Sequence, residues 1–407
     1  NNIAGKHYIF ETISEDAKIK DLNIQASFDL QMNGDLSVAG LANTNLGSIS
    51  NVNIYFVKSS ITVNTAGNLN VAGLVLDNQG YVLECAVVAN IDVKLSQNVQ
   101  SINLPSLYVG GLIGTNKASI YGLNNNYQLN SYDFVQDFDF SGKIDVASGI
   151  SATKSAIGGI VAQNNGIVGS NNNSIISSQG FSTDAVITAT GISNVGGIAG
   201  VSNGIINNAL VFANITANNN VGGVVGYVGE WLTNKTTQSS LSIANRTETD
   251  SVSVVVNNAI VEMYQDAKDE QINGKICGQN NVGGLVGYAK GYFVTSVNSN
   301  GTDGDASDDY LDVAVSKTII KNSYVQTYAN LSKISGQQNV GGLVGNALYT
   351  NIYSSYANAN LDAQKSGGLV GSATDVLVKN AYSLGTTNSS VFGSIFGSVQ
   401  GAQYQFD

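Results

Sequence analysis

The chain has 407 residues and a net charge of −11, and only 12% of its residues are charged, about half the usual share for a soluble domain. Binding to a phosphate backbone needs clustered Lys and Arg, so this composition argues against a nucleic-acid partner and against docking on an anionic membrane. No segment approaches the roughly 18 consecutive apolar residues of a membrane span, so we expect no membrane insertion.

The first 36 residues are predicted to form an initial coil or cap. Alternating apolar residues, Ile19, Leu22, Ile24 and Ala26, indicate a strand there. The chain begins at Asn1 rather than Met and shows no signal peptide, so we expect a mature or excised fragment. One proline against many Val, Ile, Thr and Tyr residues favours strands throughout, and helical periodicity is nearly absent.

From residue 37 to 407 the dominant feature is a glycine-rich repeat. Its first small residues are Ala39, Ala72, Gly110, Gly158, Gly196, Gly222, Gly283, Gly341, Gly367 and Gly393. The shortest spacing, 26 residues, occurs three times, so we interpret 26 as the bare unit and longer spacings as units with insertions. The longest insertions are expected near 231–257, 264–281 and 298–316.

A second motif lies between the glycine clusters and is followed by a strand-like segment. It begins at Glu84, Asn208, Asn258, Asn322, Ser354 and Asn380. Each unit therefore contains about three short strands separated by turns. Such units, stacked in register, predict an all-β fold: a right-handed parallel β-helix (solenoid) of about ten coils with loop insertions.

The two motifs together, Gly-Gly-Leu-Val-Gly followed by Ile-x-Asn-Ala/Ser/Cys-Tyr/Val, resemble the GLUG motif family over roughly residues 37–400. The resemblance implies a secreted or cell-surface β-helix, as in adhesins and the non-catalytic parts of some IgA-cleaving proteases. It implies surface display and leaves adhesion itself an expectation.

The glycine clusters do not fit a phosphate-binding loop. A P-loop needs Lys followed by Ser or Thr after its last glycine, and no cluster has them. A ligand loop is also needed once, whereas this cluster recurs along the chain. We therefore predict that the glycines serve tight packing or bends between stacked coils.

Tyrosines are the first candidate binding residues. Tyr324, Tyr356 and Tyr382 fall at the same unit position, so they should form a ladder on one face if the coils align. Such a ladder is either partly buried packing or a stacking surface for a sugar or a protein. Tyr227 and Trp231 flank the insertion 231–257, whose polar composition predicts a loop and a recognition surface.

An acidic segment is the candidate metal site. Asp303, Asp305, Asp308 and Asp309 could gather oxygen ligands around Ca²⁺, although the spacing departs from that of an EF-hand. The alternative is a solvated insertion kept soluble by its charge. We expect no other cofactor.

Catalytic residues are scarce, and we expect no enzyme. The single histidine, His7, lies near the start of the chain, so a catalytic triad would depend on it alone. A zinc site of the His-Glu-x-x-His type needs two histidines and is excluded. Asp133, Asp137 and Asp139 form the nearest acidic cluster for cleaving a glycan. Cys85 and Cys277 are expected to be separate thiols, because distant coils do not touch.

Three functions follow from these patterns. The first is a non-enzymatic extracellular protein, an adhesin or adhesin stalk, that binds a glycan or protein on a cell surface through its extended face and inserted loops. The second is a self-assembling subunit of an extracellular filament or coat. The third is a polysaccharide-active β-helix enzyme.

Overall fold

The computed structural model describes residues 5–122, 138–170, 180–229, 243–249, 254–264, 274–298, 310–328 and 331–405, with side chains described except at 243–249, 292–298, 310–316 and 403. Every regular element within these ranges is a β-strand. No helix in them has the length and apolar character that crossing a membrane would require.

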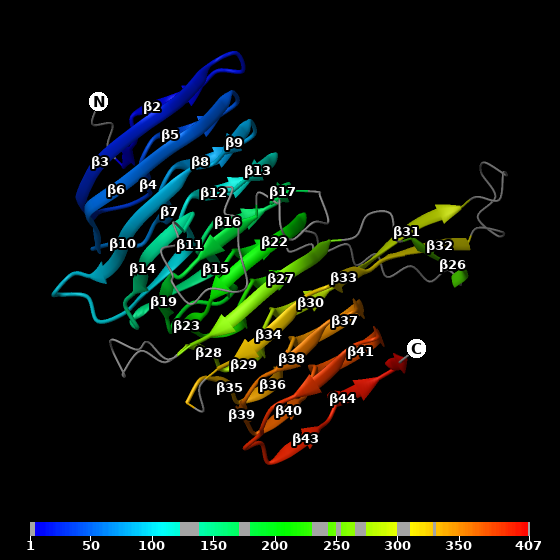
Figure 1. The fold of residues 1–407 in the computed structure, drawn as a ribbon. Coiled ribbons are helices and arrows are strands. Elements are labelled where there is room, and N and C mark those ends of the chain that lie inside the picture. The colour runs from blue at the N-terminus through cyan, green and yellow to red at the C-terminus, as the bar shows by residue number, and fades with distance from the viewer. Residues whose placement is uncertain are drawn as a thin grey trace.

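The fold is a parallel β-helix, as predicted, and each coil contributes one strand to a sheet that we call sheet A. Sheet A has eleven parallel strands in chain order: β1 (Lys6–His7), β4 (Leu36–Ala39), β7 (Asn68–Ala72), β11 (Ile102–Gly110), β15 (Ile150–Gly158), β20 (Val195–Gly196), β24 (Asn219–Gly222), β29 (Asn280–Gly283), β36 (Gln338–Gly341), β40 (Lys365–Gly367) and β43 (Val391–Gly393). We number the coils 1 to 11 by these strands. Coils 1 and 11 lie at opposite ends of the molecule (Figure 1).

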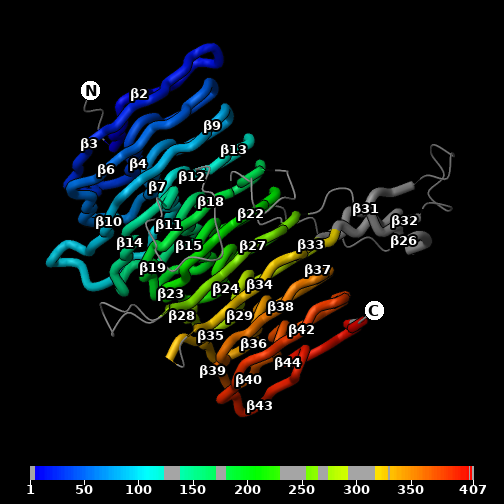
Figure 2. The backbone as a smooth tube through the Cα atoms, in the orientation of Figure 1, coloured from blue at the N-terminus to red at the C-terminus, as the bar shows by residue number. Residues whose placement is uncertain are grey.

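The second sheet, sheet B, has 31 strands and forms the rest of each coil. Coils 1 to 5 contribute β2 (Phe10–Ile13), β3 (Lys18–Met32), β5 (Ala42–Asn45), β6 (Ser48–Val63), β8 (Val75–Asn78), β9 (Tyr81–Leu83), β10 (Ala86–Leu95), β12 (Ile113–Asn116), β13 (Ser119–Tyr121), β14 (Phe140–Val146), β16 (Val161–Asn164), β17 (Ile167–Val168), β18 (Phe181–Thr183) and β19 (Val186–Ala189). Coils 6 to 11 contribute β21 (Ala199–Ser202), β22 (Ile205–Phe212), β23 (Asn214–Ala217), β25 (Val225–Val228), β27 (Val255–Met263), β28 (Lys275–Cys277), β30 (Val286–Lys290), β33 (Thr318–Lys321), β34 (Tyr324–Thr327), β35 (Lys333–Gly336), β37 (Val344–Tyr353), β38 (Tyr356–Asn358), β39 (Leu361–Ala363), β41 (Val370–Lys379), β42 (Tyr382–Leu384), β44 (Phe396–Gln400) and β45 (Gln403–Gln405). The backbone path repeats from coil to coil (Figure 2).

The first 36 residues supply coil 1. Its strands β1, β2 and β3 pair in parallel with β4, β5 and β6 of coil 2. The core then runs along the axis as rows of aliphatic side chains. One such row, fully buried in each coil, contains Val109, Ile157, Val195, Val221, Val282 and Val340.

The glycine clusters mark a sharp corner between sheet A and sheet B. In coil 8, Gly283 ends β29, and a Cβ placed there would lie 2.0 Å from the carbonyl oxygen of Val286. A Cβ on Gly284 would lie 2.1 Å from the carbonyl oxygen of Gly342 in coil 9, and one on Gly287 would lie 2.4 Å from the backbone nitrogen of Val221 in coil 7. The prediction that the glycines serve bends and close stacking between coils is therefore confirmed.

The asparagine that precedes the cluster has its own structural reason. Asn194, Asn220, Asn281 and Asn339 all have positive φ, between 54° and 60°. Asparagine tolerates this left-handed conformation better than most residues. The Nδ2 of Asn281 donates to Oδ1 of Asn220 at 2.8 Å, and the Nδ2 of Asn339 donates to Oδ1 of Asn281 at 2.9 Å. The side chains thus form a hydrogen-bonded ladder beside the glycine corner.

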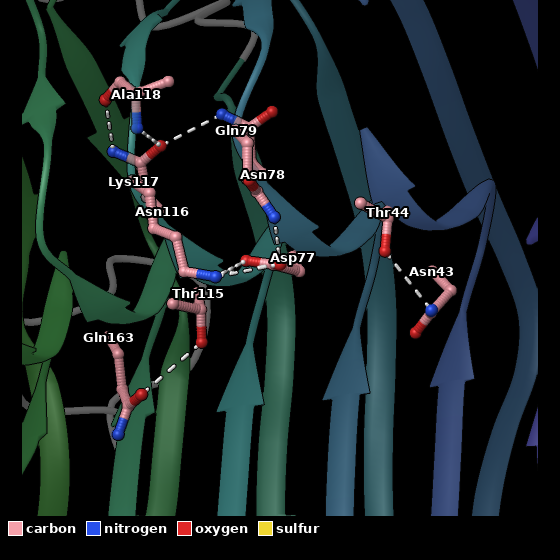
Figure 3. A network of polar contacts seen from close by, with 10 residues as sticks. All are labelled: Asn43, Thr44, Asp77, Asn78, Gln79, Thr115, Asn116, Lys117, Ala118 and Gln163. Atoms are coloured by element: carbon pink, nitrogen blue, oxygen red, sulfur yellow. Dashed lines mark hydrogen bonds and ion pairs between the residues drawn. The ribbon is translucent and has the colours of Figure 1, made fainter. Parts of the chain in front are cut away.

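A second asparagine ladder runs through the core of coils 2 to 6. Asn45, Asn78, Asn116 and Asn164 are almost fully buried, and each Nδ2 donates to the next side chain, ending at Oγ of Ser202, over 2.8 to 3.2 Å. Figure 3 shows Asn78 and Asn116, with Asn116 also hydrogen-bonded to the backbone of Ala118. This ladder was not predicted from the sequence.

Two expected insertions are smaller than predicted. Lys275–Cys277, inside the expected insertion 264–281, forms β28 and pairs with β23 and β35 of the neighbouring coils. Val255–Met263 forms β27, so the insertion expected at 231–257 ends before Val255. Part of each segment predicted as an insertion therefore forms a strand of the solenoid.

The predicted loop at 231–257 also contains a strand, so the loop prediction was wrong for part of it. β26 (Ile243–Thr249) pairs with β32 (Tyr310–Ser316), which pairs with β31 (Tyr292–Asn298). These three strands form a sheet separate from sheets A and B. Strand formation here depends on a partner from the insertion of the next coil, which local composition does not reveal.

Candidate functional site

The three tyrosines at equivalent positions come together on the outer face of sheet B. Tyr324 pairs with Tyr356 across β34 and β38, and Tyr356 pairs with Tyr382 across β38 and β42. Their ring centroids are 4.9 and 5.2 Å apart, with planes 3° and 4° from parallel. We call these residues the tyrosine ladder.

The stacking geometry limits what the tyrosine ladder can bind. Each ring in it is covered on at least one face by its neighbour, so sugar contacts through ring faces are restricted along the ladder. Tyr382, the last of the three residues, is 44% exposed. The ladder therefore combines packing between coils with one more accessible ring at its end.

A second stack lies beside the tyrosine ladder and was not predicted. Tyr264 of coil 7 and Tyr328 of coil 8 stack with centroids 4.4 Å apart and planes 3° from parallel. Both of their hydroxyls contact the carboxylate of Glu262, a residue that is only 3% exposed. We call Tyr264, Tyr328 and Glu262 the phenol–carboxylate site.

Both phenols donate to this carboxylate. The Oη of Tyr264 donates to Oε2 of Glu262 at 2.8 Å, and the Oη of Tyr328 donates to Oε1 at 3.0 Å. Burial and the nearby Glu262 carboxylate raise the pKa of Tyr264 well above its usual value, and the same two causes raise the pKa of Tyr328. Both groups therefore stay protonated as hydrogen-bond donors at neutral pH.

A comparison of adjacent coils could have revealed the phenol–carboxylate site from sequence. In β27 and the residue after it, Ile260, Glu262 and Tyr264 face outward, and they align with Tyr324, Gln326 and Tyr328 of coil 8. The signal is the pair of tyrosines four residues after Ile260 and Tyr324. These tyrosines lie beyond the motif residues that align from coil to coil, and only coils 7 and 8 carry them in the described part of the chain.

Tyr227, also predicted to bind, lies elsewhere and is buried. Its side chain is 7% exposed and packs with Ala162 and Val201, and its ring meets that of Tyr288 edge-on at 5.3 Å. Trp231, its predicted companion, lies outside the described residues. Tyr227 thus supports the outer surface of coils 7 and 8 and does not adjoin the tyrosine ladder in register.

The buried phenol of Tyr227 predicts an alkaline loss of stability. Burial raises its pKa from 10.0 to about 12. Between these values the folded chain keeps a proton that the unfolded chain releases, so the stability present below about pH 10 is lost as the pH rises. We expect the melting temperature to fall from about pH 10 upward, and to fall less in Tyr227→Phe, which keeps the ring. Melting curves that are unchanged between about pH 9 and 11.5 would contradict this.

The metal candidates, and two of the three acidic catalytic candidates, lie outside the described part of the chain. Asp303, Asp305, Asp308 and Asp309, the expected Ca²⁺ ligands, lie outside it. Within it, no group of three or more His, Cys, Asp or Glu side chains could hold a metal ion. Asp139 is fully buried and its Oδ2 accepts from the backbone nitrogen of Ser182 at 2.8 Å, which is a structural role.

The remaining catalytic candidates are two aspartates, the histidine and the two cysteines. Asp133 and Asp137 lie outside the described residues. His7 lines a hollow of about 340 Å³ that residues of coils 1 and 2 enclose, Phe28 and Phe56 among them. Cys85 and Cys277 are both free thiols, in coils 3 and 7, and burial raises the pKa of Cys85 to about 12. A thiol held protonated in this way is a weak nucleophile.

The outer surface of coils 3 to 5 carries polar contacts, and the rings of Tyr81 and Tyr121 there are tilted 44° to each other rather than stacked. Lys117 Nζ lies 2.9 Å from the carboxylate of Asp77, which also accepts from Gln79 Nε2 at 2.7 Å (Figure 3). Thr115 and Gln163 continue the row in the next coils. Exposed ion pairs of this kind contribute little to stability, so we assign them to solvation of the surface.

The chain was also compared with known proteins. No family model, curated protein sequence or solved structure matches it significantly.

Proposed function

We propose that the chain is a non-enzymatic extracellular surface protein, an adhesin or adhesin stalk, whose solenoid presents a binding surface for a glycan or protein partner. The resemblance to the GLUG motif, which rests on the repeat residues alone, supports the extracellular setting. The parallel β-helix supports a stalk, because its coils stack along one axis with a continuous core.

The observation that carries the binding role is the separate three-stranded sheet. β26 belongs to the insertion of coil 7, whereas β31 and β32 belong to the insertion of coil 8. Two consecutive coils therefore contribute to one structure that the solenoid itself does not need. Segments added to a rigid scaffold in this way are the usual location of recognition.

Neighbouring coils show that the solenoid closes without these insertions. In coil 6 the chain passes from Ser202 to Ile205 through Asn203-Gly204, where coil 7 carries residues 230–253 between Gly229 and Val254. In coil 9 the single residue Tyr349 stands where coil 8 carries residues 291–317. Both deletions can therefore be designed from coils of the same protein.

The test is a variant in which Gly229 is joined to Val254 and residues 291–317 are replaced by one tyrosine. We expect it to keep the circular dichroism spectrum of the wild type and to lose binding by at least about 10-fold, measured on arrays of host, plant and microbial glycans and of extracellular-matrix proteins.

The control is Gln163→Ala, a surface change on coil 5 far from the insertions in sequence, which should bind as the wild type does. Full binding by the deletion variant would contradict the role of the inserted strands. A wild-type chain that binds no glycan or matrix protein on either array would contradict the proposed function itself.

A further inference from the structure

The phenol–carboxylate site has a chemical arrangement that packing alone does not require. Two phenols from adjacent coils are stacked 4.4 Å apart, and both hydroxyl protons point to one carboxylate. Glu262 as a residue is only 3% exposed, so water does not replace these two donors. Tyr328 as a residue is 55% exposed, so an oxidant can reach the site from solvent.

This arrangement suits one-electron oxidation of a phenol. A phenol that loses an electron becomes strongly acidic, so oxidation is easiest where a base can take the hydroxyl proton at the same moment. The carboxylate oxygens of Glu262 are already hydrogen-bonded to those protons, at 2.8 and 3.0 Å. A positioned base of this kind accelerates proton-coupled steps by about 100-fold or more.

We propose that Tyr264 and Tyr328 are a site of oxidative cross-linking, in which their rings join through the carbons ortho to the hydroxyls and tie coil 7 to coil 8. The oxidant is hydrogen peroxide acting through a haem peroxidase, or another one-electron oxidant of the extracellular space. The inference does not depend on what the protein binds.

The step balances as follows. Each phenol loses one electron and its hydroxyl proton and becomes a phenoxyl radical, with Glu262 as the first proton acceptor. The two radicals form a carbon–carbon bond between ortho positions, and the hydrogen on each ortho carbon then moves to oxygen, which restores both aromatic rings. The chain loses two hydrogen atoms, and hydrogen peroxide takes up two electrons and two protons to form two water molecules.

The tyrosine ladder supplies an internal comparison. Tyr356 and Tyr382 are also stacked, 5.2 Å apart with planes 4° from parallel, and Tyr382 is 44% exposed. Among the described residues, no carboxylate accepts a hydrogen bond from either of these two hydroxyls. The two pairs therefore share stacking and access but differ in the base.

The experiment treats the full chain with a haem peroxidase and limiting hydrogen peroxide. We expect the intact mass to fall by two hydrogen atoms without dimer formation, dityrosine fluorescence to appear, and peptide mapping to identify the Tyr264–Tyr328 product. This product should form about 10-fold or more faster than the Tyr356–Tyr382 product in the same sample.

Three variants sharpen the result. Glu262→Gln should slow the Tyr264–Tyr328 product to the rate of the other pair, Tyr328→Phe should abolish it, and Tyr382→Phe should leave it unchanged. Equal rates for the two pairs in the wild-type chain would overturn the proposal, and this comparison needs no variant to fold. Products that are only intermolecular would also overturn it.

Discussion

Gly284→Ala is expected to lower the free energy of unfolding by about 3 kcal/mol or more, a large loss for a single methyl group. The new Cβ would lie 2.1 Å from the carbonyl oxygen of Gly342 and 2.7 Å from a methyl group of Val325. The carbonyl belongs to the backbone of the next coil, which the parallel ladders of β29 and β36 hold in place. The strain therefore cannot be relieved by rotating a side chain. Melting followed by far-ultraviolet circular dichroism measures the loss.

The matched control for this prediction is Ser394→Ala. Ser394 occupies in coil 11 the position that Gly284 occupies in coil 8, and no described coil stacks on its outer side. A Cβ is tolerated there because no carbonyl faces it. We expect the free energy of unfolding of the control to be within about 0.5 kcal/mol of that of the wild type. Similar melting temperatures for Gly284→Ala and the wild type would show that the corner is looser than its distances indicate.

The contrast between Gly284 and Ser394 explains why the fold was largely predictable. Close approach of backbones is a constraint that recurs along the stack, so glycine occupies the position of Gly284 in every coil from 2 to 10. The predicted first small residues, from Ala39 to Gly393, are in register as neighbours in sheet A. Irregular spacing between them did not hide the coils, because insertions leave the corner unchanged.

The second motif was predictable for a related reason. Its first residues, Glu84, Asn208, Asn258, Asn322, Ser354 and Asn380, all have positive φ, between 45° and 56°. A turn that needs the left-handed conformation selects asparagine repeatedly. Here too a backbone requirement selects similar residues in several coils, namely coil 3 and coils 6 to 10.

Features that occur once left no such trace. The pairing of β26 with β32 joins two insertions that are more than fifty residues apart in the chain. Neither segment contains a sequence motif that predicts which strand it pairs with. Glu262 stands alone in its row, where the aligned residues are Phe212 in coil 6 and Gln326 in coil 8. Alignment of the repeats predicts only residues that recur, so it does not predict a site built from a residue that occurs in one coil.

The core asparagine ladder falls between these cases, because it is periodic but confined to five coils. Its members lie six residues after the first small residue of the corner, as Asn116 does after Gly110. From coil 7 onward the same row is apolar, with Val228, Ala289, Ala347 and Ala373. Sequence alone does not show that this row faces inward, so these asparagines were indistinguishable from the exposed ones.

Asn116→Ala is therefore expected to destabilise the chain by about 3 to 5 kcal/mol. The Nδ2 of Asn116 donates to Oδ1 of Asn164 at 3.0 Å and to the carbonyl of Ala118 at 2.9 Å, and its Oδ1 accepts from Nδ2 of Asn78 at 3.0 Å. The change removes these bonds, leaves a cavity, and takes a partner from two buried amides. Thermal melting measures the total loss in the free energy of unfolding. Amide hydrogen exchange should show the loss of protection concentrated in coils 3 to 5.

The control that isolates burial is Asn165→Ala, one residue after Asn164 in the turn that follows. Asn165 is exposed, and its Oδ1 accepts from Nδ2 of Asn203 at 3.0 Å, so it also belongs to a bond between coils. Water can replace that bond, and we expect a change within about 0.5 kcal/mol. If the two variants lost equal stability, burial would not be what makes the core ladder matter. If Asn116→Ala lost less than about 1 kcal/mol, neighbouring amides would be finding other partners, and the ladder would act on coil register rather than on stability.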